Sequence, residues 1–138
     1  MRDYQRGVDA IDQAVADRLG INRTDLRIID ELSDGPRAAG DLAVRVGLSA
    51  AAMTTALDRL ENKGHARRIR DSGDRRKVLV EITEAARAVC QEAMGPIAEE
   101  GRLLLAGFTE PEIARIAGFL QSACTANDRQ VARLRTAG

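Results

Sequence analysis

The chain has 138 residues, with 30% charged residues, one tyrosine, two phenylalanines and a formal net charge of zero. This length suits a single domain with a real hydrophobic core, and the abundance of alanine and aliphatic residues favours a mainly helical fold. The sequence contains no apolar run long enough to span a membrane, and its first residues are too polar for a signal peptide. We therefore expect a cytoplasmic protein without a membrane partner.

The N-terminal segment predicts two helices. Apolar residues recur at helical spacing from residue 4 to residue 19, and Gly20 follows as a helix terminator. Asn22 is placed to cap a second helix. The predicted buried stripe of this second helix consists of Leu26, Ile28, Ile29 and Leu32. The turn-forming run of residues 34–36 then breaks the chain.

A short third helix is predicted over residues 41–46, ended by Gly47. Its buried side chains would be Leu42, Ala43 and Val46. No serine or threonine precedes this helix, since Arg37 and Ala38 stand there. Because a missing cap costs about 1 kcal/mol, we expect the helix to start late, with Asp41 in its first turn.

A fourth helix is predicted from Ser49 to Lys63. Ser49 stands at the N-cap position, and Gly64 stands where a left-handed residue closes a helix. The apolar stripe consists of Met53, Ala56, Leu57 and Leu60, at i, i+3, i+4 and i+7.

The opposite face of this fourth helix carries small or polar residues near its N-terminus. They are Ala51, Thr54, Thr55 and Asp58, with Arg59 at the edge. Such a face can approach DNA bases closely, and a threonine can form hydrogen bonds or touch a thymine methyl group. The alternative interpretation is an ordinary amphipathic helix whose polar face is simply solvated.

A basic hairpin follows the fourth helix. Two short strands, residues 67–70 and 78–82, flank the turn DSGDRRK. From Arg59 to Lys77 there are eight basic and three acidic residues, a local charge of +5, which leaves −5 for the rest of the neutral chain. Concentrated positive charge fits a polyanion, and an arginine near the tip can enter a minor groove. The alternative is a solvated basic loop.

Helix, turn, helix and basic hairpin together predict a winged helix-turn-helix, a DNA-binding shape. The fold class we predict is therefore mainly α with a small β-hairpin wing. The candidate DNA-binding residues are Ser49, Ala51, Thr54, Thr55, Arg59, Arg68, Arg70, Asp74, Arg75, Arg76 and Lys77.

The C-terminal part predicts two more helices. Thr83 can cap a long helix that extends to about Phe108, and Pro96 predicts a kink or break in it near Met94. Thr109, with a glutamate three residues later, forms a capping box for the last helix. The predicted buried face of that helix consists of Ile113, Ile116, Phe119 and Leu120. The polar residues 128–138 are expected to fray.

The run LSAAAMTTALDRLENKG followed by RRIRDSGDRRKVLVEIT resembles the DNA-binding core of the MarR family of bacterial transcriptional regulators. The D-x-x-D-R-R wing, which leads into a strand ending in Ile-Thr, is the most specific part of the resemblance. The resemblance implies a homodimer on a pseudo-palindromic operator, with the fourth helix in the major groove. It also implies that Arg76, rather than Arg75, enters the minor groove and that Asp74 braces an arginine.

This resemblance suggests how the chain is organised. We expect one domain, residues 1–138, with the winged helix-turn-helix lobe at residues 22–83 and dimerisation helices at residues 1–21 and 84–138. Two further functions stay open: a winged-helix module that binds a protein, and a ligand or redox sensor without a DNA output. Relatives often bind small aromatic or phenolic acids, although no polar constellation in this sequence marks such a pocket.

The remaining reactive residues give weaker indications. Cys90 and Cys124 lack metal-ligand spacing, and we interpret them as unreactive, with redox sensing left open. His65, the single histidine, could contact a phosphate, but we favour a histidine packed under the wing. Motifs for catalysis or metal binding are absent from the sequence, so we expect no enzyme, cofactor or metal.

Overall fold

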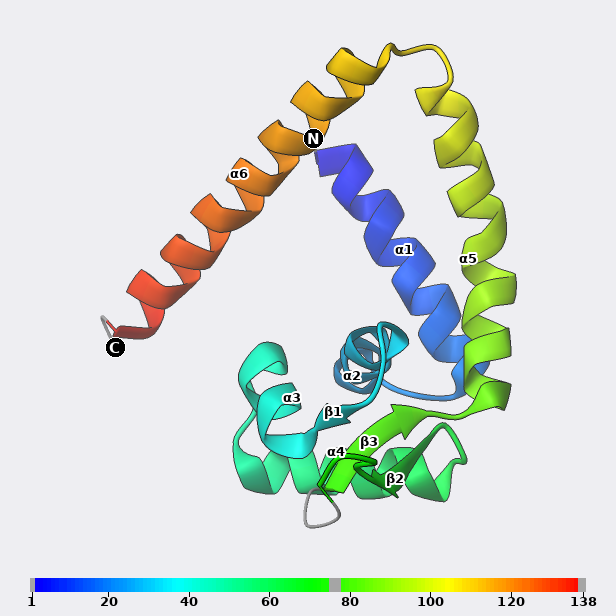
Figure 1. The fold of residues 1–138 in the computed structure, drawn as a ribbon, viewed down its shortest axis with the longest axis vertical. Helices are drawn as coiled ribbons and strands as arrows, with labels where there is room; N and C mark the ends of the chain where they lie inside the picture. Colours follow the sequence, from blue (N-terminus) through cyan, green and yellow to red (C-terminus); the bar gives the residue numbers. More distant parts are fainter. Residues whose placement is uncertain (1, 75–77, 137–138) are drawn as a thin grey trace. The chain divides into compact units, whose positions relative to one another are not determined.

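The computed structural model describes residues 2–74 and 78–136. The chain forms two compact units, residues 1–95 and 96–138, and the boundary falls inside a helix. The elements (Figure 1) are α1 (Arg2–Leu19), α2 (Arg23–Ser33), β1 (Arg37–Ala38), α3 (Ala39–Val46), α4 (Ala50–Asn62), β2 (Ala66–Arg70), β3 (Val78–Ile82), α5 (Glu84–Leu105) and α6 (Glu110–Thr136). The predicted class, mainly α with a small antiparallel wing sheet, is confirmed.

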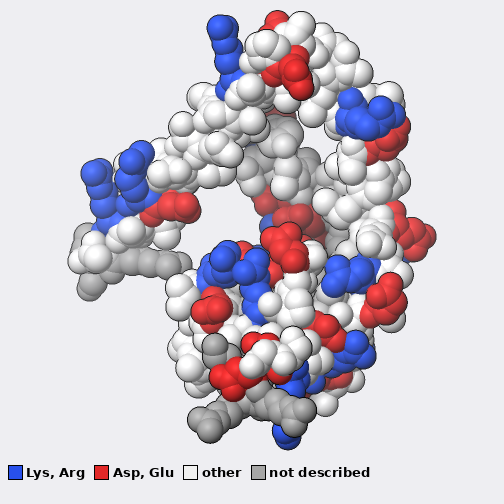
Figure 2. Space-filling model, viewed as in Figure 1, with Lys and Arg blue, Asp and Glu red and all other residues white. Residues whose placement is uncertain are grey.

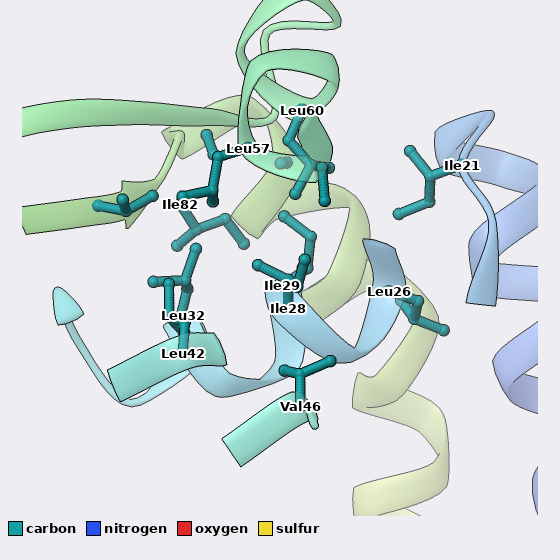
Figure 3. Close-up of a cluster of buried hydrophobic side chains, with 14 of the residues drawn as sticks. Ile21, Leu26, Ile28, Ile29, Leu32, Leu42, Val46, Leu57, Leu60 and Ile82 are labelled. Atoms are coloured by element: carbon teal, nitrogen blue, oxygen red, sulfur yellow. The ribbon is translucent and has the colours of Figure 1, made fainter. Parts of the chain in front are cut away.

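One hydrophobic core lies within residues 1–95. Side chains from α2, α3, α4 and β3 meet in it, as Figure 3 shows for a group that includes Ile29, Leu42 and Leu57. Each predicted stripe of α2, α3 and α4 is buried. The end of α1 joins the same core through Val15, Ala16 and Leu19, so α1 packs on the winged lobe as well as extending from it.

The helix ends follow the predicted capping pattern. The side chain of Asn22 accepts a hydrogen bond from the Asp25 backbone N–H over 2.8 Å, and Ser49 Oγ accepts one from Ala52 over 3.2 Å. Gly47 and Gly64 follow α3 and α4 with φ of 76° and 73°. These left-handed conformations strain any residue that has a Cβ atom, so both turns require glycine.

The start of α3 corrects a prediction. The helix begins at Ala39, and Ala38 at the N-cap makes no side-chain hydrogen bond, so the cap is missing but the start is not delayed. The reason is β1, which the sequence did not reveal. Arg37 and Ala38 pair with Val80 and Leu79 in the antiparallel order β1-β3-β2, so the sheet positions the chain just before the helix. Asp41 does lie in the first turn, as expected.

A kink or break was also predicted in α5 near Met94, and the helix has no break there. Thr83 caps this helix, accepting from the Ala86 N–H over 3.3 Å, and the helix runs on through Pro96 to Leu105. A proline removes one backbone hydrogen bond, and the turns on either side are rich in good helix formers that keep the helix continuous. The helix therefore links the two units and ends three residues earlier than expected.

The last helix extends to Thr136, through most of the segment that was expected to fray. In the single chain, Ile116, Phe119 and Leu120 of its predicted buried face are exposed by 37%, 67% and 56%, and their burial against a second copy stays a prediction. Glu112 does accept hydrogen bonds from the backbone N–H and the hydroxyl of Thr109, as a capping box requires. Within the described residues, no helix is long and apolar enough to cross a membrane.

Candidate nucleic-acid interface

The N-terminal half of α4 presents a surface of small side chains. Ser49, Ala51, Thr54 and Thr55 are all exposed, while Met53 on the opposite face is buried against the core. The cap at Ser49 and the apolar stripe together fix which face of the helix points outward. The structure therefore brings these four predicted site residues together on one exposed face.

The threonine hydroxyls on this face already donate their protons within the helix. Thr54 Oγ1 donates to the Ala50 carbonyl over 3.0 Å, and Thr55 Oγ1 donates to the Ala51 carbonyl over 3.1 Å. A hydroxyl whose proton is used in this way still has lone pairs, and the methyl group of the side chain is unaffected. Each threonine thus offers a ligand an acceptor and an apolar contact.

Arg59 forms a structural ion pair. Its Nε and Nη2 donate to the two carboxylate oxygens of Asp25 over 2.7 and 2.5 Å. The Asp25 side chain is 1% exposed and that of Arg59 is 39% exposed. The hydrogen bonds to Asp25 raise the pKa of the Arg59 guanidinium above its already high ordinary value. This bidentate pair joins α2 to α4, so Arg59 holds α4 in place against α2.

Arg68 connects strand β2 to the second half of α4. Its backbone N–H donates to Glu61 over 2.8 Å, and its guanidinium pairs with Glu61 and, over 2.8 Å, with Asp58. The neighbouring Arg67 pairs with Glu81 of β3 over 2.5 Å. Both arginines are thus held by carboxylates. Arg70, at the end of β2, is exposed and has no ion-pair partner within the described part of the chain.

These pairs reduce the positive charge inferred from the sequence. Of the five basic residues from 59 to 70, three are paired with carboxylates and two, Lys63 and Arg70, have none among the described residues. Figure 2 likewise shows acidic and basic side chains interspersed over one face of the lobe formed by residues 1–95. The electrostatic attraction that this lobe exerts on a polyanion therefore depends on fewer arginines than the sequence count indicated.

The structure describes the first part of the wing turn, up to Asp74. Asp71 accepts a hydrogen bond from the Gly73 N–H over 2.8 Å, which confirms the predicted turn at this point. Asp74 is half-buried at the end of this segment. The predicted tip residues Arg75, Arg76 and Lys77 lie outside the described residues, so the groove-inserting role assigned to Arg76 stays a prediction.

His65 is part of the scaffold beneath the wing. It is half-buried, and its Nε2 lies 2.7 Å from the Leu19 carbonyl oxygen at the end of α1. Its backbone carbonyl accepts from Thr83 over 3.0 Å. The side chain thus joins the turn after α4 to the end of α1. This contact agrees with the favoured interpretation of a packed histidine.

A cleft lies away from α4, between the ends of α1, α2 and the first half of α5. One part of about 180 Å³ is lined by Asp12, Val15, Leu26, Asp30, Cys90 and Met94. A second part of about 300 Å³ shares Asp30, Cys90 and Met94. Burial raises the pKa of the Cys90 thiol, with Asp30 adding to the effect. Cys124, the other candidate, is exposed on α6.

The sequence analysis did not identify two acidic residues: Asp25, which holds Arg59, and Asp30, which lines the cleft. Asp25 stands in the first turn of a helix, where an acidic residue already has a local explanation through the helix dipole. Its full burial and its pair with Arg59, 34 residues later, depend on how two helices pack. Asp30 has no neighbouring motif to mark it, yet it lines both parts of the cleft.

Comparison with known proteins adds an independent finding. A model of the MarR family matches residues 19–77. The uncharacterised helix-turn-helix-type transcriptional regulator YcgE of Bacillus subtilis (strain 168) is 34% identical over 124 residues, 89% of this chain and 80% of that protein.

Two solved structures share the fold. The transcriptional regulator BldR of Sulfolobus solfataricus is 30% identical, with a TM-score of 0.59 over 93% of this chain and 88% of that one. A point mutant of MepR from a multidrug-resistant S. aureus clinical isolate is 15% identical, with a TM-score of 0.71 over 91% of this chain and 92% of that one.

Proposed function

This chain belongs to the MarR family of transcriptional regulators, and on that premise we propose that it represses transcription by binding a pseudo-palindromic DNA operator as a homodimer. The observation that carries the proposal is the exposed N-terminal half of α4, with its small side chains and its capped, unobstructed end. A helix of this kind fits the major groove, where side chains contact base edges. We assign base contacts to Ala51, Thr54 and Thr55, and a phosphate contact to Ser49.

In this proposal the wing contacts the adjacent backbone and minor groove. Arg70 is exposed and without an ion-pair partner among the described residues, so it is available for a phosphate. Arg76 enters the minor groove, and Arg75 and Lys77 contact phosphates beside it. Asp74 braces one of the wing arginines. Arg59 and Arg68 stabilise this interface through their ion pairs with carboxylates on α2 and α4.

The proposed homodimer is supported by the apolar surface of residues 96–136. Among the side chains in this range whose burial is described, none is buried. The large exposed hydrophobic ones are Ile97, Leu103, Leu104, Leu105, Phe108, Ile116, Phe119, Leu120, Val131 and Leu134. A second copy of the chain would cover such a surface symmetrically. A two-fold dimer also places two recognition helices about one DNA turn, roughly 34 Å, apart.

The test is fluorescence anisotropy on the duplex upstream of the protein's own reading frame, against a scrambled duplex, at two salt concentrations. We expect sequence-preferring binding that weakens steeply with salt, because bound phosphates release counterions. Arg76→Ala should weaken binding about ten-fold, within the range of about 1–3 kcal/mol for a specific groove contact. Arg27→Ala is the matched control, since it removes one exposed charge from α2 and is not a candidate DNA-binding residue.

Three results would contradict the proposal. Equal, salt-insensitive affinity for both duplexes and for selected genomic fragments would favour the protein-interaction module instead. If the Arg76→Ala and Arg27→Ala variants both kept the wild-type affinity, the wing would not be part of the DNA interface. Sedimentation of the free protein gives the oligomeric state, and a monomer at assay concentration would exclude the dimer.

We further propose that a small molecule in the α1–α2–α5 cleft releases the DNA, and that it is a neutral or cationic aromatic compound. Asp30 lines both parts of the cleft and has no ion-pair partner among the described residues, whereas Asp12 is paired with Arg23 over 3.3 Å. Burial and the charges of Asp12 and Glu31 raise the pKa of Asp30. A second negative charge placed here would be repelled, so an aromatic or phenolic acid is the poorer fit.

A matched ligand series tests this effector class. Benzylamine, benzyl alcohol and benzoate share one ring and differ in charge, and each is added to the preformed protein–DNA complex. We expect release in the order benzylamine, benzyl alcohol, benzoate, and loss of that order in an Asp30→Asn variant. If benzoate released the DNA most strongly, an aromatic acid would be the better candidate for the effector. Release requires that the compound bind the DNA-free conformation more tightly, so it also reports a conformational difference.

A further inference from the structure

We propose that α4 recognises A·T base pairs, through thymine methyl groups and adenine amino groups, and that it makes no bidentate contact to guanine. This inference rests on the proposed function, because it names the class of sequence that the same helix reads. It is based on the hydrogen-bond donors on and near α4 that already have partners within the protein.

The two threonines present acceptors and methyl groups to the groove. Their hydroxyl protons go to the Ala50 and Ala51 carbonyls, so their oxygens are free to accept but not to donate. In the major groove adenine and cytosine present amino donors, thymine presents a methyl group, and guanine presents the acceptors N7 and O6. A lone-pair acceptor is repelled by a guanine edge and satisfied by either amino group, so the thymine methyl group is what distinguishes an A·T pair from a G·C pair.

The long donors that could read guanine are held elsewhere. Arginine and lysine are the residues that bind guanine N7 and O6 together. Arg59 is bound to buried Asp25, and Arg68 is bound to Asp58 and Glu61. Turning either toward a base would leave a carboxylate unpaired, and in the case of Asp25 a buried one.

The other donors of α4 lie at its two ends. Ser49 Oγ already accepts from Ala52, which leaves its proton beside the unpaired N–H groups of the first turn. These groups suit a phosphate oxygen. Ala51 and Ala52 are exposed between this end and the threonines, and alanine contacts the thymine methyl group. Lys63 stands at the opposite end of the helix. The middle of the face is therefore apolar or hydrogen-bond accepting.

The experiment uses the full-length protein and a duplex selected from a randomised pool. In the selected site each thymine is replaced in turn by uracil, which lacks only the methyl group. Each guanine is likewise replaced by 7-deazaguanine, which lacks only the N7 acceptor. We expect A·T pairs at the positions that α4 faces and a loss of about four-fold per contacted methyl group, comparable to one buried methyl. We expect 7-deazaguanine to have no effect.

Paired protein variants tie the effect to the two threonines. The double variant Thr54→Val, Thr55→Val keeps both branched methyl positions and loses the hydroxyls, so it should still distinguish thymine from uracil. The variant Thr54→Ser, Thr55→Ser keeps the hydroxyls and loses the methyl groups, so it should lose the difference between thymine and uracil at the positions that the threonines contact. Helix content measured by circular dichroism controls for folding in both variants.

The outcomes separate this inference from the function on which it rests. If the protein selects a site, but uracil has no effect at any position and 7-deazaguanine weakens binding, A·T readout is overturned and the regulator stands. If the selected site has G·C pairs at the positions that α4 faces, the methyl argument fails in the same way. If no sequence is selected from the pool, the proposed function fails, and this inference fails with it.

Discussion

Replacing Arg59 by methionine should strongly destabilise the lobe formed by residues 1–95. Arg59 supplies the two hydrogen bonds, 2.7 and 2.5 Å long, that hold the Asp25 carboxylate, which is 1% exposed. Methionine keeps the length and helix propensity of the side chain but leaves a buried carboxylate without a counter-charge. Breaking a buried pair from one side costs about 3–5 kcal/mol. The Arg59 side chain is 39% exposed, so we expect the lower end of that range.

The matched control is Arg67→Met. Arg67 also pairs with a carboxylate, Glu81, over 2.5 Å, but the two side chains are 68% and 22% exposed. Exposed pairs contribute about 0–1 kcal/mol, because water replaces the lost partner. The shortest distance is 2.5 Å in both pairs, but the Arg59 pair is bidentate and its carboxylate is buried. We therefore expect a much larger loss of stability in Arg59→Met than in Arg67→Met.

Urea unfolding followed by far-ultraviolet circular dichroism measures both effects, at one protein concentration because association also stabilises the fold. A loss of about 3 kcal/mol corresponds to a fall of about 10 °C in Tm for a chain of this size. The double variant Asp25→Leu, Arg59→Met should recover most of the loss, since an apolar pair needs no counter-charge. Equal losses in the Arg59→Met and Arg67→Met variants would refute the reasoning, because burial of Asp25 would then carry no cost.

Three further predictions concern other parts of the chain. Gly64→Ala should cost about 1–2 kcal/mol in urea unfolding because its φ is +73°, whereas Gly40→Ala, with open space around the added Cβ, should be neutral or stabilising; equal effects would contradict the left-handed turn. Asp30→Asn should raise stability more near neutral pH than at acid pH, because a carboxyl whose pKa is raised in the folded state loses stability as pH rises through that pKa; a pH-independent difference would argue against it. In a Cys124→Ser variant, alkylation of Cys90 near neutral pH should be slower than that of free cysteine, because burial raises its thiol pKa; equal rates would indicate an accessible thiolate.

The helices of the winged lobe could be located from the sequence because their signals are local. Hydrophobic stripes at helical spacing placed α2, α3 and α4, and Asn22, Ser49 and Gly64 marked their ends. Capping and left-handed glycine turns depend on residues within a few positions of each other. The resemblance to the MarR family depended on equally local runs, and the family model and the relative at 34% identity agree with it.

Features that join distant segments could not be located in this way. The strand β1 has two residues and no pattern of its own, and it exists because β3 pairs with it. The burial of Asp25, and the pairing of Arg68 with α4, depend on surfaces that meet only after the helices pack. A count of charges along the chain therefore overstated the free positive charge near the wing.

The sequence by itself determined the family and the type and order of the helices and of the two hairpin strands, because hydrophobic period, caps and turn residues act over short distances. Tertiary structure alone decided which charged groups are available to a ligand. Arg59 is bound to a buried carboxylate and Arg70 is not paired among the described residues, although both are arginines in the same basic run. The physical reason is that the Coulomb energy of a charge depends on its burial and its partner, and both are set by segments far apart in the chain.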